Sequence, residues 1–456
     1  MDHSIARSRS ARTAAVATVG AAALVALSAV GPASGLAVAG AKASLPAPVP
    51  ASHGHVLKTG MAAPVPTSVC LSQIQIRCYT PLQYRTAYNL APVYDAGITG
   101  KGRTIVIVDS FGSPTIQNDL QVFDKQFGLP DTTVDVRQWG TVPPFDPTNA
   151  DQNGWAGETT LDVEYAHAIA PGAHIVLIET GVSETEGTTG FPEMMSAEDN
   201  AIRHGLGDVI SQSFGATENT FPDYQVNGTR SLMALRYAFK DAAMRGVTVL
   251  GASGDNGATD ATLDGTGTYP YPVDSWPSAD PLVTSVGGTQ LTLDDSGART
   301  APDMVWNDGY GAGGGGISGV FARPWYQNGV AQVTGDHRGT PDISMTAAVN
   351  GAAWTYQSFD PTSVGWGLVG GTSEATPIFS GIVALADQKA GHRLGLINPA
   401  LYAMAEHPDR NGIVDVTVGN NSFAGVTGYD ATPGYDLASG VGTIDAARFV
   451  AALARR

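Results

Sequence analysis

One serine stands in a context that could make it a nucleophile. Ser373 lies in the run 371–377 (GTSEATP), a turn that leads into an apolar segment extending to about Ala390. The pattern predicts a helix that begins at this turn, with Pro377 in its first turn, where a missing N–H costs little. The free N–H groups and the dipole of a helix N-terminus stabilise an oxyanion. The commoner role of a lone serine at such a position is to cap the helix.

Two carboxylates could serve as the base that a serine nucleophile requires. Glu158 and Asp162 are four residues apart in a segment with a helical pattern, so both side chains would lie on one helix face. Like charges at that spacing repel each other, and a solvated acidic face is the commoner interpretation of such a pair. Glu164 would lie on a different face, and we expect it to be structural.

An aspartate follows directly after a predicted strand at residues 247–253. Asp255 is part of the run 252–257 (ASGDNG). A carboxylate would repel an oxyanion, whereas a protonated carboxyl group can donate a hydrogen bond to it. Asp255 would therefore assist catalysis only in its protonated form. The alternative is a turn aspartate that binds its own backbone.

Together these motifs resemble those of the sedolisin (serine-carboxyl peptidase) family, a branch of the subtilisin clan. The resemblance extends from about Tyr79 to the C-terminus. It rests on the three motifs above and on the runs YTP (79–81), SQSFG (211–215) and PDIS (341–344).

The resemblance implies a role for each of these residues. Ser373 would be the nucleophile and Glu158 its general base. Asp162 would be the partner of Glu158, and Asp255 would donate to the oxyanion in place of the asparagine that a subtilisin uses. An extended peptide commonly binds by adding a strand, and the residues that would bind the substrate backbone in this way are Ser213, Phe214 and Gly215.

The resemblance also implies one Ca²⁺ site near the C-terminus. Two carboxylates and backbone carbonyl oxygens form the hard-oxygen ligand set that this ion prefers. Thr432 stands where the family often has glycine, a change that a carbonyl ligand tolerates. The alternative is a pair of turn aspartates without a metal. The implied ligands are the side chains of Asp415 and Asp436 and the carbonyl oxygens of Val416, Thr432 and Gly434.

The first interpretation of these residues is a secreted peptidase that hydrolyses peptide bonds of proteins or peptides at acid pH. A neutral Ser-His-Asp peptidase would use His167 and Asp109, but the chain lacks the His-Gly-Thr-His run of a subtilisin. A cation at a helix C-terminus, as at His167, commonly has a structural role, and we expect Asp109 to be structural. A third alternative is an inactive secreted binding protein on a peptidase scaffold. Chemically competent residues at all four catalytic positions argue against it.

The elements that would position these groups alternate along the chain. Helical patterns and short, nearly all-apolar strands follow one another, which favours a parallel sheet covered on both faces. The predicted fold is α/β: a subtilisin-like, doubly wound, mostly parallel sheet. Active sites of such sheets lie beyond the carboxyl ends of the strands. The expected strands are 104–109, 175–179, 209–214 and 247–253, and the expected helices are 116–127, 158–168, 194–204, 231–245 and 373–390.

The composition excludes some partners. The 456 residues carry a formal net charge of -17, and only 15% of them are charged. Nucleic acids and anionic membranes require clustered Lys and Arg, so we expect neither as a partner. The glycine-rich run 311–319 lacks the Lys-Ser or Lys-Thr of a phosphate loop. We expect the protein to be a monomer.

The N-terminal residues predict export. Three arginines precede an apolar stretch from Ala14 to Val30, a pattern typical of a secretory signal peptide. The alternative is a membrane anchor, but the stretch is short for a span of about 20 residues. We expect a signal peptide at 1–43 (cleaved between 33 and 43), a short Pro/Ala-rich leader at 44–67 and a catalytic domain at 68–456. Cys70 and Cys78, close together in an exported chain, predict a local disulfide.

Overall fold

The computed structural model describes residues 55–58 and 61–456 of the chain. The predicted signal peptide at 1–43 lies outside the described residues, as does most of the predicted leader at 44–67. All described residues belong to one compact unit. Within that part of the chain, no helix has both the length and the apolar character that crossing a bilayer requires.

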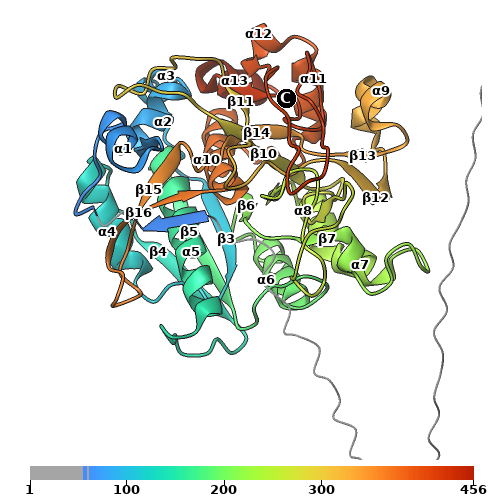
Figure 1. Cartoon of the computed structure of the whole chain (residues 1–456), viewed down its shortest axis with the longest axis horizontal. Helices are drawn as coiled ribbons and strands as arrows, with labels where there is room; N and C mark the ends of the chain where they lie inside the picture. The colour runs from blue at the N-terminus through green and yellow to red at the C-terminus, as the bar shows by residue number, and fades with distance from the viewer. Residues whose placement is uncertain (1–54, 59–60) are drawn as a thin grey trace, which may run out of the picture. The chain divides into compact units, whose positions relative to one another are not determined.

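A mostly parallel sheet forms the centre of the structure (Figure 1). Its eight described strands follow the order β11-β10-β8-β6-β3-β5-β4, and β14 pairs with β10. Strand β11 runs antiparallel to β10, whereas the other neighbouring pairs are parallel. The strands are β3 (Thr104–Ser110), β4 (Val134–Trp139), β5 (His174–Thr180), β6 (Val209–Gln212), β8 (Thr248–Ala252), β10 (Thr284–Gln290), β11 (Met304–Val305) and β14 (Ile343–Thr346).

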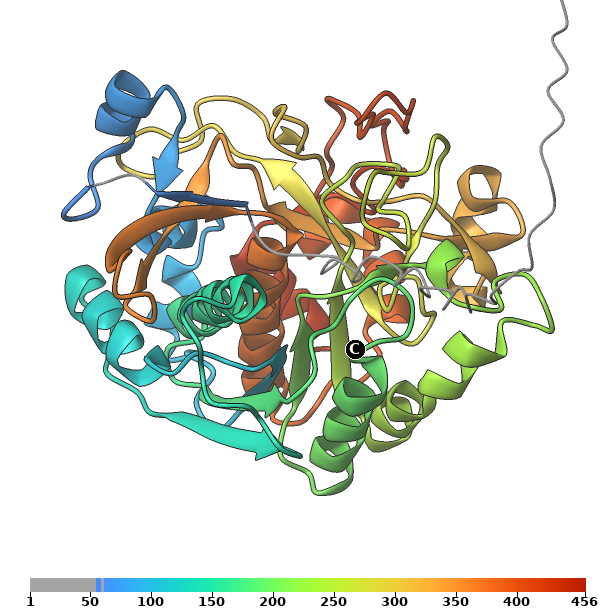
Figure 2. The same ribbon diagram turned by 60° about the horizontal axis from the view of Figure 1, so that its bottom comes forward.

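Helices cover both faces of this sheet, which confirms the predicted fold class (Figures 1 and 2). In β3, Ile105 and Ile107 belong to the apolar core shared with α5 and α10, and Val106 and Val108 to the core shared with α6 and α8. Side chains alternate across a strand, and each buried aliphatic side chain stabilises the fold by about 1.5–3 kcal/mol. An all-apolar strand therefore requires a helix on each side. The covering helices are α5 (Ala150–Ile169), α10 (Thr372–Ala390), α6 (Phe191–Arg203) and α8 (Tyr237–Arg245).

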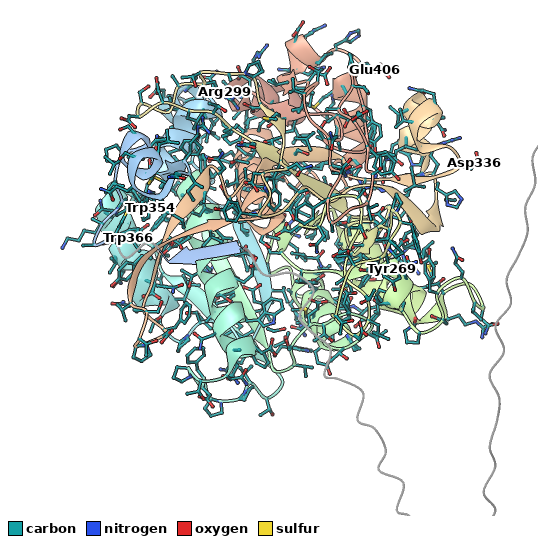
Figure 3. All side chains as sticks on the ribbon, in the orientation of Figure 1. Tyr269, Arg299, Asp336, Trp354, Trp366 and Glu406 are labelled. Carbon is teal, nitrogen blue, oxygen red and sulfur yellow. A yellow bond between two sulfur atoms is a disulfide. The ribbon has the colours of Figure 1, made fainter. Side chains whose placement is uncertain are left out.

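A smaller sheet has the order β1-β16-β15-β2 and packs against α4 and α5. Trp354 of β15 and Trp366 of β16 mark it in Figure 3, and the Trp366 ring lies 5.5 Å from that of Phe127 on α4, measured between centroids. The strands and this helix are β1 (His55–Lys58), β16 (Gly365–Gly370), β15 (Ala352–Gln357), β2 (Cys78–Tyr79) and α4 (Ile116–Phe127).

Strand β1 corrects one prediction. Residues 55–58 were expected in a flexible leader, but they pair antiparallel with β16, with His55 opposite Gly370. Pairing at a sheet edge uses main-chain hydrogen bonds and demands little of the side chains. The Pro- and Ala-rich composition around these residues therefore contained no sign of the strand.

Several element boundaries also differ from the predictions. Helix α5 begins at Ala150 rather than at Glu158, because the Asn149 side chain accepts hydrogen bonds from the next backbone N–H groups and caps it. The helical pattern at 231–245 consists of two helices that meet at Arg236. Pro377 lies in the second turn of α10, not in the first.

The disulfide between Cys70 and Cys78 is present, as predicted, and links α1 to β2. The other helices are α1 (Thr67–Ile74), α2 (Pro81–Ala87), α3 (Ala91–Asp95), α7 (Arg230–Leu235), α9 (Ala331–Thr334), α11 (Asn398–Ala405), α12 (Pro408–Asn411) and α13 (Ala446–Leu453). Short two-stranded pairs are formed by β7 (Ala216–Thr217) with β9 (Ser275–Trp276), β12 (Ile317–Ala322) with β13 (His337–Gly339), and β17 (Ile413–Val414) with β18 (Thr443–Ile444).

Candidate active site

Ser373 lies at the start of α10, where the smaller sheet leads into this helix. Strand β16 ends at Gly370, and Gly371 turns the chain with a φ of 145°, a value that residues with a side chain rarely adopt. Ser373 follows the first residue of the helix and is 1% exposed. The predicted placement of this hydroxyl at a helix N-terminus is therefore confirmed.

Pro377 leaves the main-chain carbonyl of Ser373 without its helical partner. In an α-helix this oxygen would accept a hydrogen bond from the N–H four residues later, and proline has none. The Ser213 hydroxyl lies 3.4 Å from that carbonyl oxygen and donates to Asp162 Oδ1 at 2.8 Å. Ser213 thus connects the turn that carries the serine to helix α5.

Helix α5 holds the two carboxylates away from solvent. Glu158 is 3% exposed and Asp162 is fully buried, so the alternative of a solvated acidic face is wrong. Burial raises the pKa of Asp162 well above its ordinary value, charges on Asp109 and Glu158 raise it further, and the hydrogen bond from Ser213 opposes the shift. Asp162 therefore keeps its proton at pH values where surface carboxyl groups have lost theirs.

Asp109 contributes to the electrostatics of this site, although we expected it to be only structural. It lies in β3 and is fully buried. Burial raises its pKa to about 7, a hydrogen bond with Thr159 lowers it, and the charge on Glu179 raises it. Because the charge on Asp109 raises the pKa of Asp162, ionisation of one group makes ionisation of the other less favourable. Its position near the carboxyl end of a buried strand was the signal that could have identified it.

Two hydrogen bonds tie Asp255 to the same turn. The backbone N–H and the hydroxyl of Thr372 donate to Asp255 Oδ1 at 2.7 and 2.8 Å. The Gly254 N–H in turn donates to the Thr372 hydroxyl oxygen at 3.1 Å. A turn aspartate that binds its own backbone does not account for these bonds. Thr372, which no sequence motif marked as functional, is the residue that joins Asp255 to the start of α10.

The predicted substrate-binding segment follows β6, which ends at Gln212 and not at residue 214 as expected. The Ser213 hydroxyl faces Asp162, and the Phe214 ring is fully buried in the core beside Phe191. A Cβ atom at Gly215 would lie 3.1 Å from the Trp276 carbonyl oxygen. Ser213 and Phe214 point their side chains into the protein and Gly215 has none, so binding by this segment would use its backbone.

His167 is not part of this arrangement. Its Nε2 lies 3.3 Å from Asp124 Oδ1 and 3.0 Å from the Pro130 carbonyl oxygen. The ring is fully buried at the end of α5. The hydrogen bond and ion pair of His167 go to Pro130 and Asp124 rather than to Asp109 or Ser373, so the Ser-His-Asp combination is not assembled.

The residues of the implied calcium site lie on two neighbouring loops. The Gly434 N–H donates to Asp415 Oδ2 at 2.9 Å, and the Thr432 N–H donates to Asp436 Oδ2 at 2.8 Å. Burial raises the pKa of Asp436, and hydrogen bonds from residues 432, 438 and 439 oppose the shift. Within the described residues, no cluster of three or more His, Cys, Asp or Glu side chains could hold a metal ion. Any site here would therefore depend on carbonyl oxygens in addition to the two carboxylates.

Comparison with known proteins identifies the family. The sequence model of the subtilase family (Peptidase_S8) matches residues 149–403, which is more than half of the chain. Kumamolisin of Bacillus sp. (strain MN-32) is 33% identical over 384 residues, a match that covers 82% of this chain and 63% of the relative. Sedolisin of Pseudomonas sp. (strain 101) is 31% identical over 385 residues, covering 82% and 61%. Tripeptidyl-peptidase sed4 of Aspergillus fumigatus is 29% identical over 386 residues, covering 72% and 59%.

A solved structure agrees with these matches. Pseudomonas sedolisin (serine-carboxyl proteinase), complexed with two molecules of pseudo-iodotyrostatin, superposes with a TM-score of 0.68 and 28% sequence identity. The match covers 82% of this chain and 98% of that one. The chain belongs to the subtilase family and, within it, to the sedolisins with their subtilisin-like fold. It spans about three fifths of the length of the curated relatives named above (63%, 61% and 59%).

Proposed function

We propose that this chain is a secreted serine-carboxyl peptidase that hydrolyses peptide bonds of proteins or peptides at acid pH. The observation that carries the proposal is the Ser213 hydroxyl, which donates to Asp162 on α5 and lies 3.4 Å from the carbonyl oxygen of Ser373 on α10. The hydrogen bonds from Thr372 to Asp255 bring the turn after β8, which carries Asp255, to the start of α10. The relatives named sedolisin and tripeptidyl-peptidase support this activity.

In the proposed mechanism, Glu158 takes the proton of the Ser373 hydroxyl as this oxygen attacks the carbonyl carbon of the substrate. The C–O bond forms, and the electron pair of the carbonyl moves to its oxygen. Glu158 then returns the proton to the departing amine as the C–N bond breaks. A water molecule repeats the sequence on the acyl-enzyme and releases the second product, so no proton is gained or lost over the cycle.

Two neutral carboxyl groups support these steps. Burial raises the pKa of Asp162, so at acid pH its carboxyl group keeps a proton that can stabilise the Glu158 carboxylate. Asp255 Oδ1 accepts two hydrogen bonds from Thr372, so the proton of a neutral Asp255 belongs on Oδ2, where it can be donated to the oxyanion. Acid pH is thus required by Asp255, whereas the raised pKa of Asp162 keeps that carboxyl group protonated to higher pH, and Glu158 must be ionised.

The test of this function is a digest of a peptide library, read by mass spectrometry between about pH 3 and pH 8, with Ser373→Ala as the comparison. The parent should cleave peptides at acid pH, and the variant should lose about 10³-fold or more in kcat while its circular dichroism spectrum is unchanged. An Ala variant with near-parental cleavage would remove Ser373 from the mechanism. A folded parent that cleaves nothing would favour the binding-protein alternative.

We also propose that residues 1–43 direct export, that residues 68–456 form the catalytic domain, and that the exported protein acts as a monomer away from membranes. The pattern of arginines, apolar residues and small residues at the N-terminus supports export. The disulfide between Cys70 and Cys78 is the kind of bond that persists in oxidising compartments. Mass spectrometry of protein from the culture medium would locate the new N-terminus.

One calcium ion is proposed on the C-terminal loops. The side chains of Asp415 and Asp436 lie against the same short loop, and burial raises the pKa of Asp436, a shift that a bound cation would oppose. These groups fit a hard-oxygen site when the carbonyl oxygens of Val416, Thr432 and Gly434 complete it. The ion would neutralise the two carboxylates and fix the loops, without a part in the chemistry at Ser373.

A further inference from the structure

Directly beside the nucleophile, the chain buries a carboxyl group that the proposed mechanism does not use. Glu374 follows Ser373 on α10 and is fully buried. Neither of its carboxyl oxygens has a hydrogen-bond partner of good geometry. A buried, ionised and unpaired carboxylate costs far more than a neutral one, so this group requires an explanation.

The groups around Glu374 can accept hydrogen bonds from it but have few protons to donate to it. The titratable side chains that act on it are Asp255 and three tyrosines, Tyr84, Tyr88 and Tyr165. The Tyr84 hydroxyl donates its proton to the Gly351 carbonyl oxygen at 2.9 Å. Tyr165 donates its proton to the carbonyl oxygen of residue 354 at 2.9 Å, and the Tyr88 hydroxyl oxygen accepts from the N–H of residue 346 at 2.8 Å.

This arrangement suits a protonated Glu374. Since the proton of Tyr84 is directed to Gly351, its hydroxyl oxygen can accept a proton from a neutral Glu374 but has none to give to a carboxylate. Burial raises the pKa of Glu374 well above its ordinary value, and the charge on Asp255 raises it further. A hydrogen bond between Tyr84 and Glu374 opposes this shift, but Tyr84 could donate its proton to the carboxylate only by turning it away from Gly351.

We propose that Glu374 is a positioning residue that acts only in its protonated form, fixing the first turn of α10 and with it Ser373. The proposal rests on the peptidase function above and adds a second acid to Asp255. Ionisation of Glu374 would place a buried negative charge beside the turn that must stabilise an oxyanion. Asp255 and Glu374 would therefore impose two successive limits on activity as the pH rises.

The first experiment does not depend on peptidase activity. In a Ser373→Ala background, the stability of Glu374→Gln is compared with that of its parent by urea unfolding at a series of pH values. A carboxyl group whose folded pKa is raised stabilises the fold below its unfolded pKa of about 4.3, and that stability is lost as the pH rises. Gln cannot ionise, so the folded-to-unfolded ratio of the variant relative to the parent should grow by up to about tenfold per pH unit above that value.

The second experiment measures kcat/KM against pH. Asp255→Asn removes the first limit and should leave an alkaline decline at higher pH, caused by Glu374. The double variant Asp255→Asn/Glu374→Gln should lack that decline. Glu164→Gln is the matched control, because Glu164 is also buried with a raised pKa but accepts hydrogen bonds from the backbone N–H of Tyr356, away from Ser373. Combined with Asp255→Asn, it should leave the decline in place.

The outcomes separate this proposal from the peptidase function. If the parent cleaves nothing, the peptidase function fails, and the unfolding series still decides whether Glu374 must be protonated. A stability difference between Gln and Glu that is independent of pH would overturn the proposal, as would identical alkaline declines in the single and double variants. Gln has the size of a neutral Glu, so failure of Glu374→Gln to fold at acid pH would overturn it as well.

Discussion

Replacement of Asp255 by asparagine separates the two properties of this side chain that the mechanism uses, donation and ionisation. Asn Oδ1 can accept the same two hydrogen bonds from Thr372 that Asp255 accepts at 2.7 and 2.8 Å. Its amide group takes the place of the protonated oxygen and supplies a donor that never ionises. The variant should therefore fold and retain an oxyanion donor.

Asp255→Ala shows how much activity and stability should be lost when the side chain can neither donate nor accept a hydrogen bond. It removes the donor, which costs about 10²–10³ in kcat at a single oxyanion donor. It also leaves the N–H of Thr372 without its acceptor at a site where Asp255 is only 8% exposed, whereas the Thr372 hydroxyl can still donate to the Gly254 carbonyl oxygen. Each buried group left unsatisfied costs about 1–3 kcal/mol, so the Ala variant should also have a lower Tm. The Asn variant should exceed the Ala variant in both activity and Tm.

The assay is kcat/KM on a fluorescent peptide between about pH 3 and pH 8. The parent should give a bell-shaped curve on the acid side, whose limbs report macroscopic values of the coupled carboxyl groups. In Asp255→Asn the alkaline limb should move to higher pH or flatten, because the donor no longer ionises. Circular dichroism at every pH excludes loss of fold as the cause. A folded Asn variant with the parental alkaline limb would refute the role assigned to Asp255.

Two further predictions concern stability. Burial raises the pKa of Asp162, so its carboxyl group stabilises the fold below about pH 4, and this contribution is lost as the pH rises. Asp162→Asn should therefore lose less Tm between pH 4 and pH 7 than the parent does. An equal loss of Tm would contradict the raised pKa of Asp162. A chelator should lower the Tm of the parent by removing a ligand that binds only the folded state. Asp436→Ala should abolish this sensitivity to the chelator. The calcium site would be contradicted if elemental analysis found the parent metal-free and added Ca²⁺ left its Tm unchanged.

The order of the main elements could be predicted from the sequence because a single physical pattern produces it. A strand such as β3 must be apolar on both faces when α5 and α10 cover one side and α6 and α8 the other. The glycine at 371 and the apolar run after Ser373 likewise indicated the start of α10, since few residues other than glycine adopt its φ of 145°.

Features that depend on tertiary contacts could not be predicted in this way. The pairing of residues 55–58 with β16 uses backbone groups that every residue has. The influence of Asp109 on Asp162 depends on β3 and α5 packing together, which no local pattern records. Thr372 has the appearance of an ordinary helix-start residue, and its hydrogen bonds to Asp255 arise because the chain ends of β8 and β16 meet. Glu374 shows its unusual character only through its burial among tyrosines.

Pro377 limits the stability of helix α10. Any other residue at this position would supply the missing N–H and remove a proline from a helix interior, a change ordinarily worth about 3 kcal/mol or more. The same change would draw the Ser373 carbonyl into the helical ladder and away from the Ser213 hydroxyl. A directed-evolution screen for heat resistance would therefore select replacements at residue 377 that a screen for turnover discards. Thermal stability and the proposed catalytic rate would therefore place opposite demands on one backbone oxygen, the carbonyl of Ser373.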